Sequence, residues 1–383
     1  MRRKTVRRMD PQRSTRGRER GDRVGSLRSR LLPVFFVLSI GAGLGSTTLS
    51  CVSTRLQPEQ LPAQPIAFLH WPDKAASKRA EIFEKASELP PPPGGETPER
   101  TLREIQAHLR AEVSPALQLR LAKHPGRLML YWPQTGEVEP VEAAPLDALP
   151  LAWSPDHKRL LFASARRGGE EQLYEYHMER RDLSPITVGP AEHPRGSYLG
   201  DGRLVVHRSE QRSRYSLPHQ SLVLTGLAGR VERVIAEDVI PGSLHFLPGQ
   251  DRIVYEKVDV RPRSAGPAFY QSMLATLGLE PGATEQVLVR GREPTPTPDG
   301  RWIVFASESS AGYRLRRMRL DGTSRVPIRP GDSEERMPSV SPDGEFIVFV
   351  QVVNGRRRLA VRSFDGTRER MLLKEGWSEF PVW

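Results

Sequence analysis

Short, nearly unbroken hydrophobic segments recur along the chain, each followed by a segment in which apolar and polar residues alternate. Trp302–Ser307 reads WIVFAS and Phe346–Gln351 reads FIVFVQ, and both are rich in β-branched and aromatic residues. Such runs predict β-strands that are covered on both faces, as in stacked sheets. Tyr313–Thr323 and Arg357–Thr367 alternate instead and contain Asp-Gly, which predicts a half-exposed strand that ends in a tight turn.

A turn motif precedes each hydrophobic segment. It reads Ser-Pro-Asp-Gly from Ser341, Thr-Pro-Asp-Gly from Thr297 and Ser-Pro-Asp-His from Ser154, and it is degraded from Leu199 and Leu247. Proline presets φ for the turn, aspartate bonds its own downstream backbone, and glycine accepts a positive φ. The central apolar position recurs at steps of 44, 49, 50 and 44 residues, at Leu161, Val205, Val254, Val304 and Val348. This period, with four short strands in each unit, predicts a β-propeller.

Fragments at the two ends of the repeat region predict how the ring closes. Ser378–Trp383 matches the first strand of a blade, and residues 126–141 match the third and fourth strands. Ala116–Lys123 is the candidate for the second strand. One blade would therefore combine the C-terminus with N-terminal strands, which leaves no open edge in the ring. We expect an all-β fold, a six-bladed β-propeller closed by the C-terminal strand over residues 116–383.

These repeats resemble those of the TolB family of periplasmic propellers, with sharp motifs at Ser154, Thr297 and Ser341. The resemblance implies a non-catalytic platform of the cell envelope that docks other envelope proteins at the faces of the ring. The chain departs from this family before the propeller. TolB carries a sizeable α/β domain there, whereas about 65 residues separate Cys51 from Ala116. A specific role in the Tol–Pal system is therefore not implied.

Residues 1–50 have the layout of a secretory signal peptide with a long basic n-region. Arg28 and Arg30 precede an apolar stretch from Leu31 to Gly45, and small residues follow up to Ser50. Cys51 is the only cysteine and resembles the lipidated cysteine of bacterial lipoproteins. Two alternatives stay open, an ordinary secreted protein and an uncut anchor. All three place the body outside the cytoplasm, and we favour a periplasmic lipoprotein of the outer membrane, with the membrane as a partner through Cys51.

Charge argues against a nucleic-acid partner. The chain carries 57 Lys and Arg against 46 Asp and Glu, for a net charge of +11. Residues 1–30 contribute 12 basic and 3 acidic side chains, whereas the chain from Cys51 onward holds 45 against 43. A nucleic-acid binder would be expected to keep a basic face on its folded part. The basicity lies in the leader instead.

Residues 51–115 are predicted to form a linker and a two-helix support segment. Pro65–Trp71 is a possible strand, and Asp73–Glu88 is a helix with an aspartate cap. A proline run then precedes a second helix, in which Thr97 is the cap and Pro98 lies in the first turn. The alternative is a pair of docking helices.

Catalytic motifs are sparse. None of the nine histidines shows the spacing of a zinc site, and no nucleophile elbow or phosphate loop occurs. His207, His219 and His245 lie in adjacent units and are the residues that could converge on a central channel. The aspartates of the Asp-Gly pairs occur singly, one per turn, which favours a structural role over calcium binding. We therefore expect no enzyme activity, no metal and no cofactor.

The longest departure from the period, Lys257–Glu285, is the candidate partner-binding loop. It combines arginine with aromatic and sulfur side chains, which interfaces favour, at Arg261, Arg263, Phe269, Tyr270 and Met273. A merely longer connection between strands two and three is the alternative. A basic run from Arg314 to Arg319 is interpreted as a solvated blade edge.

Three functions follow for a rigid ring that presents loops on two faces. The favoured hypothesis is a monomeric, protein-binding component of the cell envelope. A carbohydrate- or small-ligand-binding propeller is the first alternative, which aromatic residues on one face would favour. A polysaccharide lyase or hydrolase is the second, which histidines or carboxylates around a metal in the channel would favour.

Overall fold

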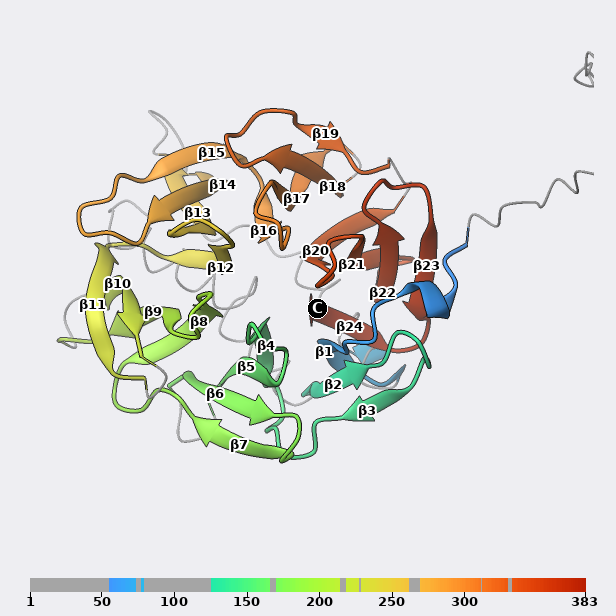
Figure 1. The fold of residues 1–383 in the computed structure, drawn as a ribbon, viewed down its shortest axis with the longest axis horizontal. Helices are drawn as coiled ribbons and strands as arrows, with labels where there is room; N and C mark the ends of the chain where they lie inside the picture. The colour runs from blue at the N-terminus through green and yellow to red at the C-terminus, as the bar shows by residue number, and fades with distance from the viewer. Residues whose placement is uncertain are drawn as a thin grey trace, which may run out of the picture. The chain divides into compact units, whose positions relative to one another are not determined.

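The computed structural model describes residues 55–73, 77–78, 125–165, 170–213, 218–226, 229–261, 269–310, 312–329 and 333–383. These residues form six four-stranded antiparallel sheets arranged as the blades of a ring (Figure 1). The all-β, six-bladed propeller predicted from the repeat is thereby confirmed. None of the helices in this part of the chain has the length and apolar character needed to cross a bilayer.

Each blade follows the chain from the axis outward, and we number the blades in chain order. Blade 1 contains β4 (Leu149–Trp153), β5 (Arg159–Ser164), β6 (Gln172–His177) and β7 (Asp182–Pro185). Blade 2 contains β8 (Glu192–Tyr198), β9 (Leu204–Glu210), β10 (His219–Thr225) and β11 (Val231–Glu237). Blade 3 contains β12 (Pro241–Leu247), β13 (Arg252–Arg261), β14 (Phe269–Gly278) and β15 (Gln286–Arg290).

The remaining blades complete the ring. Blade 4 contains β16 (Arg292–Pro296), β17 (Trp302–Ser309), β18 (Gly312–Arg319) and β19 (Val326–Pro327). Blade 5 contains β20 (Glu334–Val340), β21 (Phe346–Val353), β22 (Arg356–Ser363) and β23 (Glu369–Leu373). The closing blade contains β24 (Trp377–Val382), β1 (Ile66–Trp71), β2 (Arg127–Tyr131) and β3 (Val138–Pro140), in that order from the axis.

The closing blade confirms closure by the C-terminal strand and corrects one assignment. Its second strand is β1, which pairs with β24 on one side and with β2 on the other. The prediction that residues 116–123 fill this position was wrong, and those residues lie outside the described part. A second strand is covered on both faces, and Ile66–Leu69 is buried throughout. ALQLRLAK would place Arg120 and Lys123 in such a strand, at a high desolvation cost. The propeller sheets thus include residues before the boundary expected at residue 116.

The hydrophobic core lies between neighbouring blades. The central residue of each second strand faces the next sheet and is fully buried, at Leu161, Val205, Val254, Val304 and Val348. Burial on both faces explains why these strands are written as unbroken apolar runs. The apolar positions that define the repeat are therefore the positions that hold adjacent blades together.

The repeated turn has one geometry wherever its hydroxyl is present. Ser341 Oγ donates to Asp343 Oδ1 at 2.5 Å and accepts the backbone N–H of Phe346 at 2.9 Å. The turns at Ser154 and Thr297 repeat both bonds. The same arrangement holds the outer turn from Ser363, which the sequence motif had not included. The aspartates thus bond locally, as the structural interpretation predicted.

A short N-terminal segment is attached to the ring beside β23. Leu56 and Leu61 are buried in the cluster between blade 5 and the closing blade, and they flank the 3-10 helix η1 (Pro58–Gln60). Arg55 forms a parallel bridge with Glu369 of β23. Of the first predicted helix, Asp73, Ser77 and Lys78 are described, and all three are helical. The second predicted helix lies outside the described residues.

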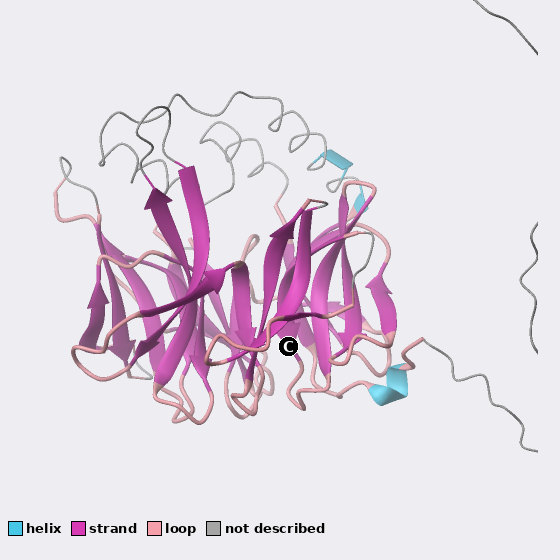
Figure 2. Ribbon diagram, turned by 90° about the horizontal axis from the view of Figure 1, so that it is seen from above, coloured by secondary structure: helices cyan, strands magenta, loops and turns pink. Residues whose placement is uncertain are grey.

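Antiparallel pairing sorts the connections onto two faces of the ring, seen edge-on in Figure 2. The Ser-Pro-Asp-Gly turns join strands one and two on one face, which we call the turn face. Connections between strands two and three, and those between successive blades, lie on the other, which we call the hairpin face. Each innermost strand therefore runs from the hairpin face to the turn face.

Candidate binding site in the central cavity

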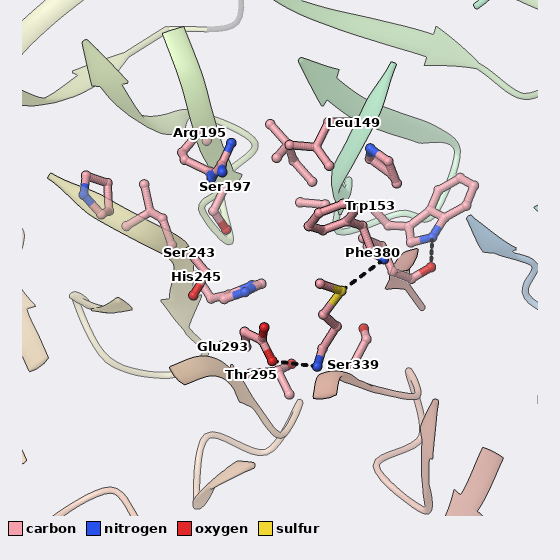
Figure 3. Close-up of a pocket in the computed structure, with 18 of the residues that line it drawn as sticks. Leu149, Trp153, Arg195, Ser197, Ser243, His245, Glu293, Thr295, Ser339 and Phe380 are labelled. Carbon is pink, nitrogen blue, oxygen red and sulfur yellow. Dashed lines mark hydrogen bonds between the residues drawn. The ribbon is translucent and has the colours of Figure 1, made fainter. Parts of the chain in front are cut away.

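The innermost strands of all six blades surround a cavity of about 1110 Å³ at the centre of the ring. These strands are β24, β4, β8, β12, β16 and β20. Figure 3 shows the side chains that they direct into it. A cavity of this size, enclosed by a preformed scaffold, is the default position for a binding site.

A recurrent bulge shapes the wall of the cavity. The pairing of the innermost strand with its neighbour shifts register in every blade. In blades 4 and 5 the residue four positions before the turn has a positive φ, Glu293 at 54° and Met337 at 51°. Phe380, at the equivalent position of β24, has a φ of 54°. Non-glycine residues adopt this conformation at a cost, and it is concentrated at functional sites.

Hydrogen bonds from blade to blade stabilise these strained residues. The amide of Glu293 donates to Glu256 Oε2 at 3.0 Å, and the amide of Met337 donates to Glu293 Oε2 at 2.6 Å. The amide of Phe380 in turn donates to the sulfur of Met337 at 3.4 Å (Figure 3). A side chain of one blade thus accepts a hydrogen bond from the backbone N–H of the next blade, and these bonds hold this wall of the cavity in place.

The same wall carries ion pairs between buried or nearly buried side chains. Arg292 Nε lies 3.2 Å from Glu256 Oε1, and Arg336 Nη2 lies 3.0 Å from Glu293 Oε1. Arg357 Nη1 lies 2.5 Å from Glu379 Oε1. These carboxylates and guanidinium groups balance one another, so this wall is polar and its charge is internally compensated.

Arg195 of blade 2 reaches across to blade 3 and differs from these arginines, because it bonds carbonyl oxygens and none of the described carboxylates. Arg195 Nε donates to the carbonyl of Gly242 at 2.8 Å and Nη1 donates to the carbonyl of Pro194 at 2.7 Å. Among the described residues, no carboxylate forms an ion pair with this guanidinium. Burial lowers the pKa of Arg195, while the charges of Glu171 and Glu256 raise it. The guanidinium stays charged, because arginine is not deprotonated in proteins.

Two further polar side chains, both from β12, lie beside Arg195. Ser243 Oγ is buried without a hydrogen-bond partner among the described residues. His245 points toward the middle of the cavity (Figure 3). Burial lowers the pKa of His245 to about 4, so its imidazole is neutral at pH 7. We call Arg195, Ser243 and His245 the polar cluster.

A further part of the wall is largely apolar. It is formed by β4, which lies beside β8, and by side chains of β1 and β24 of the closing blade, and it includes Leu149 and Trp153 (Figure 3). The apolar side chains on this wall are Leu69, Trp71, Leu149, Leu151, Trp153, Phe380 and Val382. The cavity is therefore amphipathic, because it presents both a guanidinium that forms no ion pair with the described carboxylates and a group of apolar side chains.

The histidines singled out from the sequence do not form a metal site. His207 and His245 line the cavity, but His207 Nε2 bonds Gln220 Oε1 at 2.7 Å. His219 lies in β10 and pairs with Glu237 of the outer strand at 2.5 Å. No group of three His, Cys, Asp or Glu side chains in the described ranges could hold a metal ion. Of the three histidines that could converge on the channel, His207 and His245 line the cavity and His219 does not.

The candidate partner-binding loop is largely a β-hairpin on the hairpin face. β13 and β14 pair without interruption from Arg252 opposite Gly278 to Arg261 opposite Phe269. Tyr270 also lies in β14, and Met273 pairs with Lys257. Arg263 lies outside the described residues, and so does Cys51, so partner binding and lipidation both stay predictions.

Of the polar residues that line the cavity, the sequence pointed to His207 and His245 but not to Arg195, Ser243 or Glu293. A local signal existed, because Arg195, Ser243, Glu293, Met337 and Phe380 share the fourth position before the turn of their own repeats. The residues at that position are Arg, Ser, Glu, Met and Phe, so they show no shared chemistry that would mark a site. Only their placement around one axis shows that they meet.

Solved structures with the same architecture include TolB from Acinetobacter baumannii. It matches with a TM-score of 0.56 at 14% identity, over 84% of this chain and 68% of that chain. The nidogen/laminin complex matches with a TM-score of 0.51 at 9% identity, over 67% of this chain and 95% of that chain. An oligogalacturonate lyase from Vibrio parahaemolyticus matches with a TM-score of 0.41 at 14% identity, over 64% of this chain and 68% of that chain.

Neither a protein-family model nor a curated protein sequence matches the chain. At the identities found, the solved structures show the fold alone. The chain has a TolB-like β-propeller fold.

Proposed function

We propose that this protein is an exported, non-catalytic propeller that binds a segment of a partner protein in its central cavity. The amphipathic cavity carries the proposal. Its walls are preformed and locked from blade to blade, so a ligand meets a rigid surface and loses little free energy to ordering it.

The chemistry of the cavity supports binding rather than catalysis. The carboxylates of Glu256, Glu293 and Glu379 are each held by an arginine. Glu256 and Glu293 also accept a backbone amide, and Glu379 accepts an indole N–H. A general acid or base needs a proton-transfer group directed at the substrate. These groups are directed at the protein instead, and they stabilise the wall.

We further propose that the partner enters from the hairpin face. Glu293 lies near the beginning of β16 and Arg195 lies in the middle of β8, and both strands start on that face. The β13–β14 hairpin, with the candidate partner-binding residues Arg261, Phe269 and Tyr270, ends on the same face. A segment bound in the cavity would thus continue across the predicted docking loop.

Site-specific photo-crosslinking in intact cells tests this function. A photoreactive phenylalanine analogue replaces Leu151 on the apolar wall of the cavity, or Val234 on the outermost strand β11, which is 44% exposed, as the matched control. We expect a discrete protein adduct from position 151 and none from position 234. Equal protein adducts from both positions, or none from position 151, would contradict the proposal. A glycan adduct from position 151 would favour the carbohydrate-binding alternative.

Membrane attachment is a separate proposal that rests on the leader and on Cys51. Cells are labelled with radioactive palmitate, and we expect label in the intact chain and none in the Cys51→Ala variant. Label that survives Cys51→Ala, or label in neither protein, would contradict lipidation at Cys51.

A further inference from the structure

Two groups of the polar cluster are not fully hydrogen-bonded to the described residues. Arg195 holds its place through two carbonyl oxygens, and Nη2 of its guanidinium makes no hydrogen bond to the described residues. Ser243 Oγ is buried and unpaired. Unsatisfied polar groups are rare in native structures and each one calls for an explanation.

The three side chains of the polar cluster lie together on adjacent innermost strands. The carbonyl that receives Arg195 Nε belongs to Gly242, the residue directly before Ser243, so the guanidinium crosses from β8 to β12. Arg195, Ser197, Ser243 and His245 occupy one side of the cavity in Figure 3. Gly242 packs against the carboxylate of Glu256, and a Cβ at this position would lie 2.8 Å from Glu256 Cδ. A side chain there would displace that carboxylate, so this position favours glycine and keeps the backbone of β12 open to Arg195.

Charge and hydrogen-bonding capacity define what these groups would bind. A guanidinium donates several N–H bonds in a plane and matches the two oxygens of a carboxylate, and a neutral imidazole can donate one more. The Ser243 hydroxyl is buried in this rotamer and can donate to the same ligand after rotation about χ1. Glu171 and Glu256 lie near enough to act on Arg195 electrostatically. Their charges disfavour a dianion such as phosphate more than a singly charged group.

We propose that Arg195, Ser243 and His245 form a subsite for a carboxylate whose attached apolar portion lies against the Leu149–Trp153 wall. The inference deepens the proposed function, because it names the chemistry of the partner segment that the cavity takes. An acidic side chain next to an apolar one has both parts of this ligand.

A pair of small probes tests the subsite in the purified full-length protein without any partner. 4-Phenylbutyrate carries the carboxylate and the apolar portion, and 4-phenylbutanamide differs only in lacking the charge. Isothermal titration calorimetry measures both. We expect the carboxylate to bind at least about tenfold more tightly, since a hydrogen bond to a charged group typically contributes that much.

Variants assign the preference to named residues. Arg195→Gln should remove the preference for the carboxylate and leave the amide unchanged. Ser243→Ala should reduce the preference about threefold, and it removes a hydroxyl that makes no protein hydrogen bond, so folding is expected to be unaffected. Arg180→Gln, on the outer surface, is the control. Equal affinity for the two probes, a preference that survives Arg195→Gln, or no binding of either probe would overturn the subsite.

Two peptides distinguish the source of the carboxylate. Acetyl-Leu-Asp-Phe-amide and acetyl-Leu-Asn-Phe-amide are titrated in the same way, and inorganic phosphate serves as the dianion. Tighter binding of the aspartyl peptide than of 4-phenylbutyrate identifies an acidic side chain, and the reverse order identifies a free acid; both support the subsite. Tighter binding of phosphate would overturn it. Failure of the crosslinking experiment alone would remove the protein partner and leave the carboxylate subsite standing.

Discussion

Substitution of the last residue tests whether the ring depends on its C-terminal closure. Trp383 follows β24 and is 6% exposed. Its indole packs against Phe346 with ring centroids 6.4 Å apart, and its Nε1 donates to the carbonyl of Gln64 at 3.0 Å. Its amide donates to Ser339 Oγ at 3.0 Å. Trp383 thus joins blade 5, the closing blade and the N-terminal segment.

The expected cost of Trp383→Ala follows from these contacts. Truncation of a buried tryptophan to alanine destabilises a protein by about 3–5 kcal/mol, because contacts are lost and a cavity remains. Loss of the indole hydrogen bond leaves the carbonyl of Gln64 without its partner, which adds about 1 kcal/mol. For a domain of this size, 1 kcal/mol shifts the melting temperature by roughly 2 °C. We therefore expect Trp383→Ala to lower it by about 8–12 °C.

Trp302→Ala is the matched control for this experiment. Trp302 begins β17, is half-buried, and stacks with Arg317 and Arg319 at 5.4 and 5.3 Å from the ring centre. Each such contact contributes about 0.5–1 kcal/mol at an exposed site, so a decrease of only about 2–4 °C is expected. Thermal denaturation followed by circular dichroism measures both variants. If Trp383→Ala melts no lower than Trp302→Ala, the closing strand does not hold the ring and the reasoning is refuted.

Three further perturbations test the interior and the turns. The side chain of Arg362 is 1% exposed and bonds Glu335 at 2.5 Å. Arg362→Met should therefore lower the free energy of unfolding in urea by about 3–5 kcal/mol, and adding Glu335→Gln should restore part of that loss. A loss under about 1 kcal/mol would contradict a buried ion pair. His193 is buried, and burial lowers its pKa to about 4, so the unfolded chain binds the proton first and stability should fall by about 3 kcal/mol as pH drops from 6.5 to 4. Because burial also lowers the pKa of His245 to about 4, His193→Gln should reduce this dependence without removing it, and an unchanged slope would show that His193 does not contribute. Ser341→Ala should lower the free energy of unfolding by about 1–2 kcal/mol, since the amide of Phe346 and the carboxylate of Asp343 lose their partner; an unchanged denaturation midpoint would refute the role of the turn hydroxyl.

The turns, the blade period and the number of blades could be predicted from the linear sequence. The turn from Ser341 is held by bonds that reach only to Phe346, so its chemistry lies within a few neighbouring residues. The second strands are equally legible, because burial on both faces demands an unbroken apolar run. The turn from Ser363 was predicted from its Asp-Gly pair but not as a copy of the repeated turn, because its second residue is phenylalanine in place of proline. Its hydrogen bonds are nonetheless the same.

The second strand of the closing blade was misassigned because its pairing is distant in the chain. Ile66–Trp71 and residues 116–123 both read as apolar segments before the third strand, and the nearer one was chosen. In the folded protein β1 lies beside β24, and His70 Nδ1 bonds Ser378 Oγ across 308 positions of sequence. Such a pairing is selected by whether both faces can be buried, which only the assembled neighbours decide.

The cavity belongs entirely to the tertiary structure. Arg195 and Ser243 are 48 positions apart and carry no shared motif, whereas Glu293, Met337 and Phe380 are linked only by bonds between blades. Local rules determine turns and strands, because their hydrogen bonds join near neighbours. The electrostatics of the central site depend on which side chains six separate strands direct toward one axis, and that follows only from the bulges and from closure of the ring.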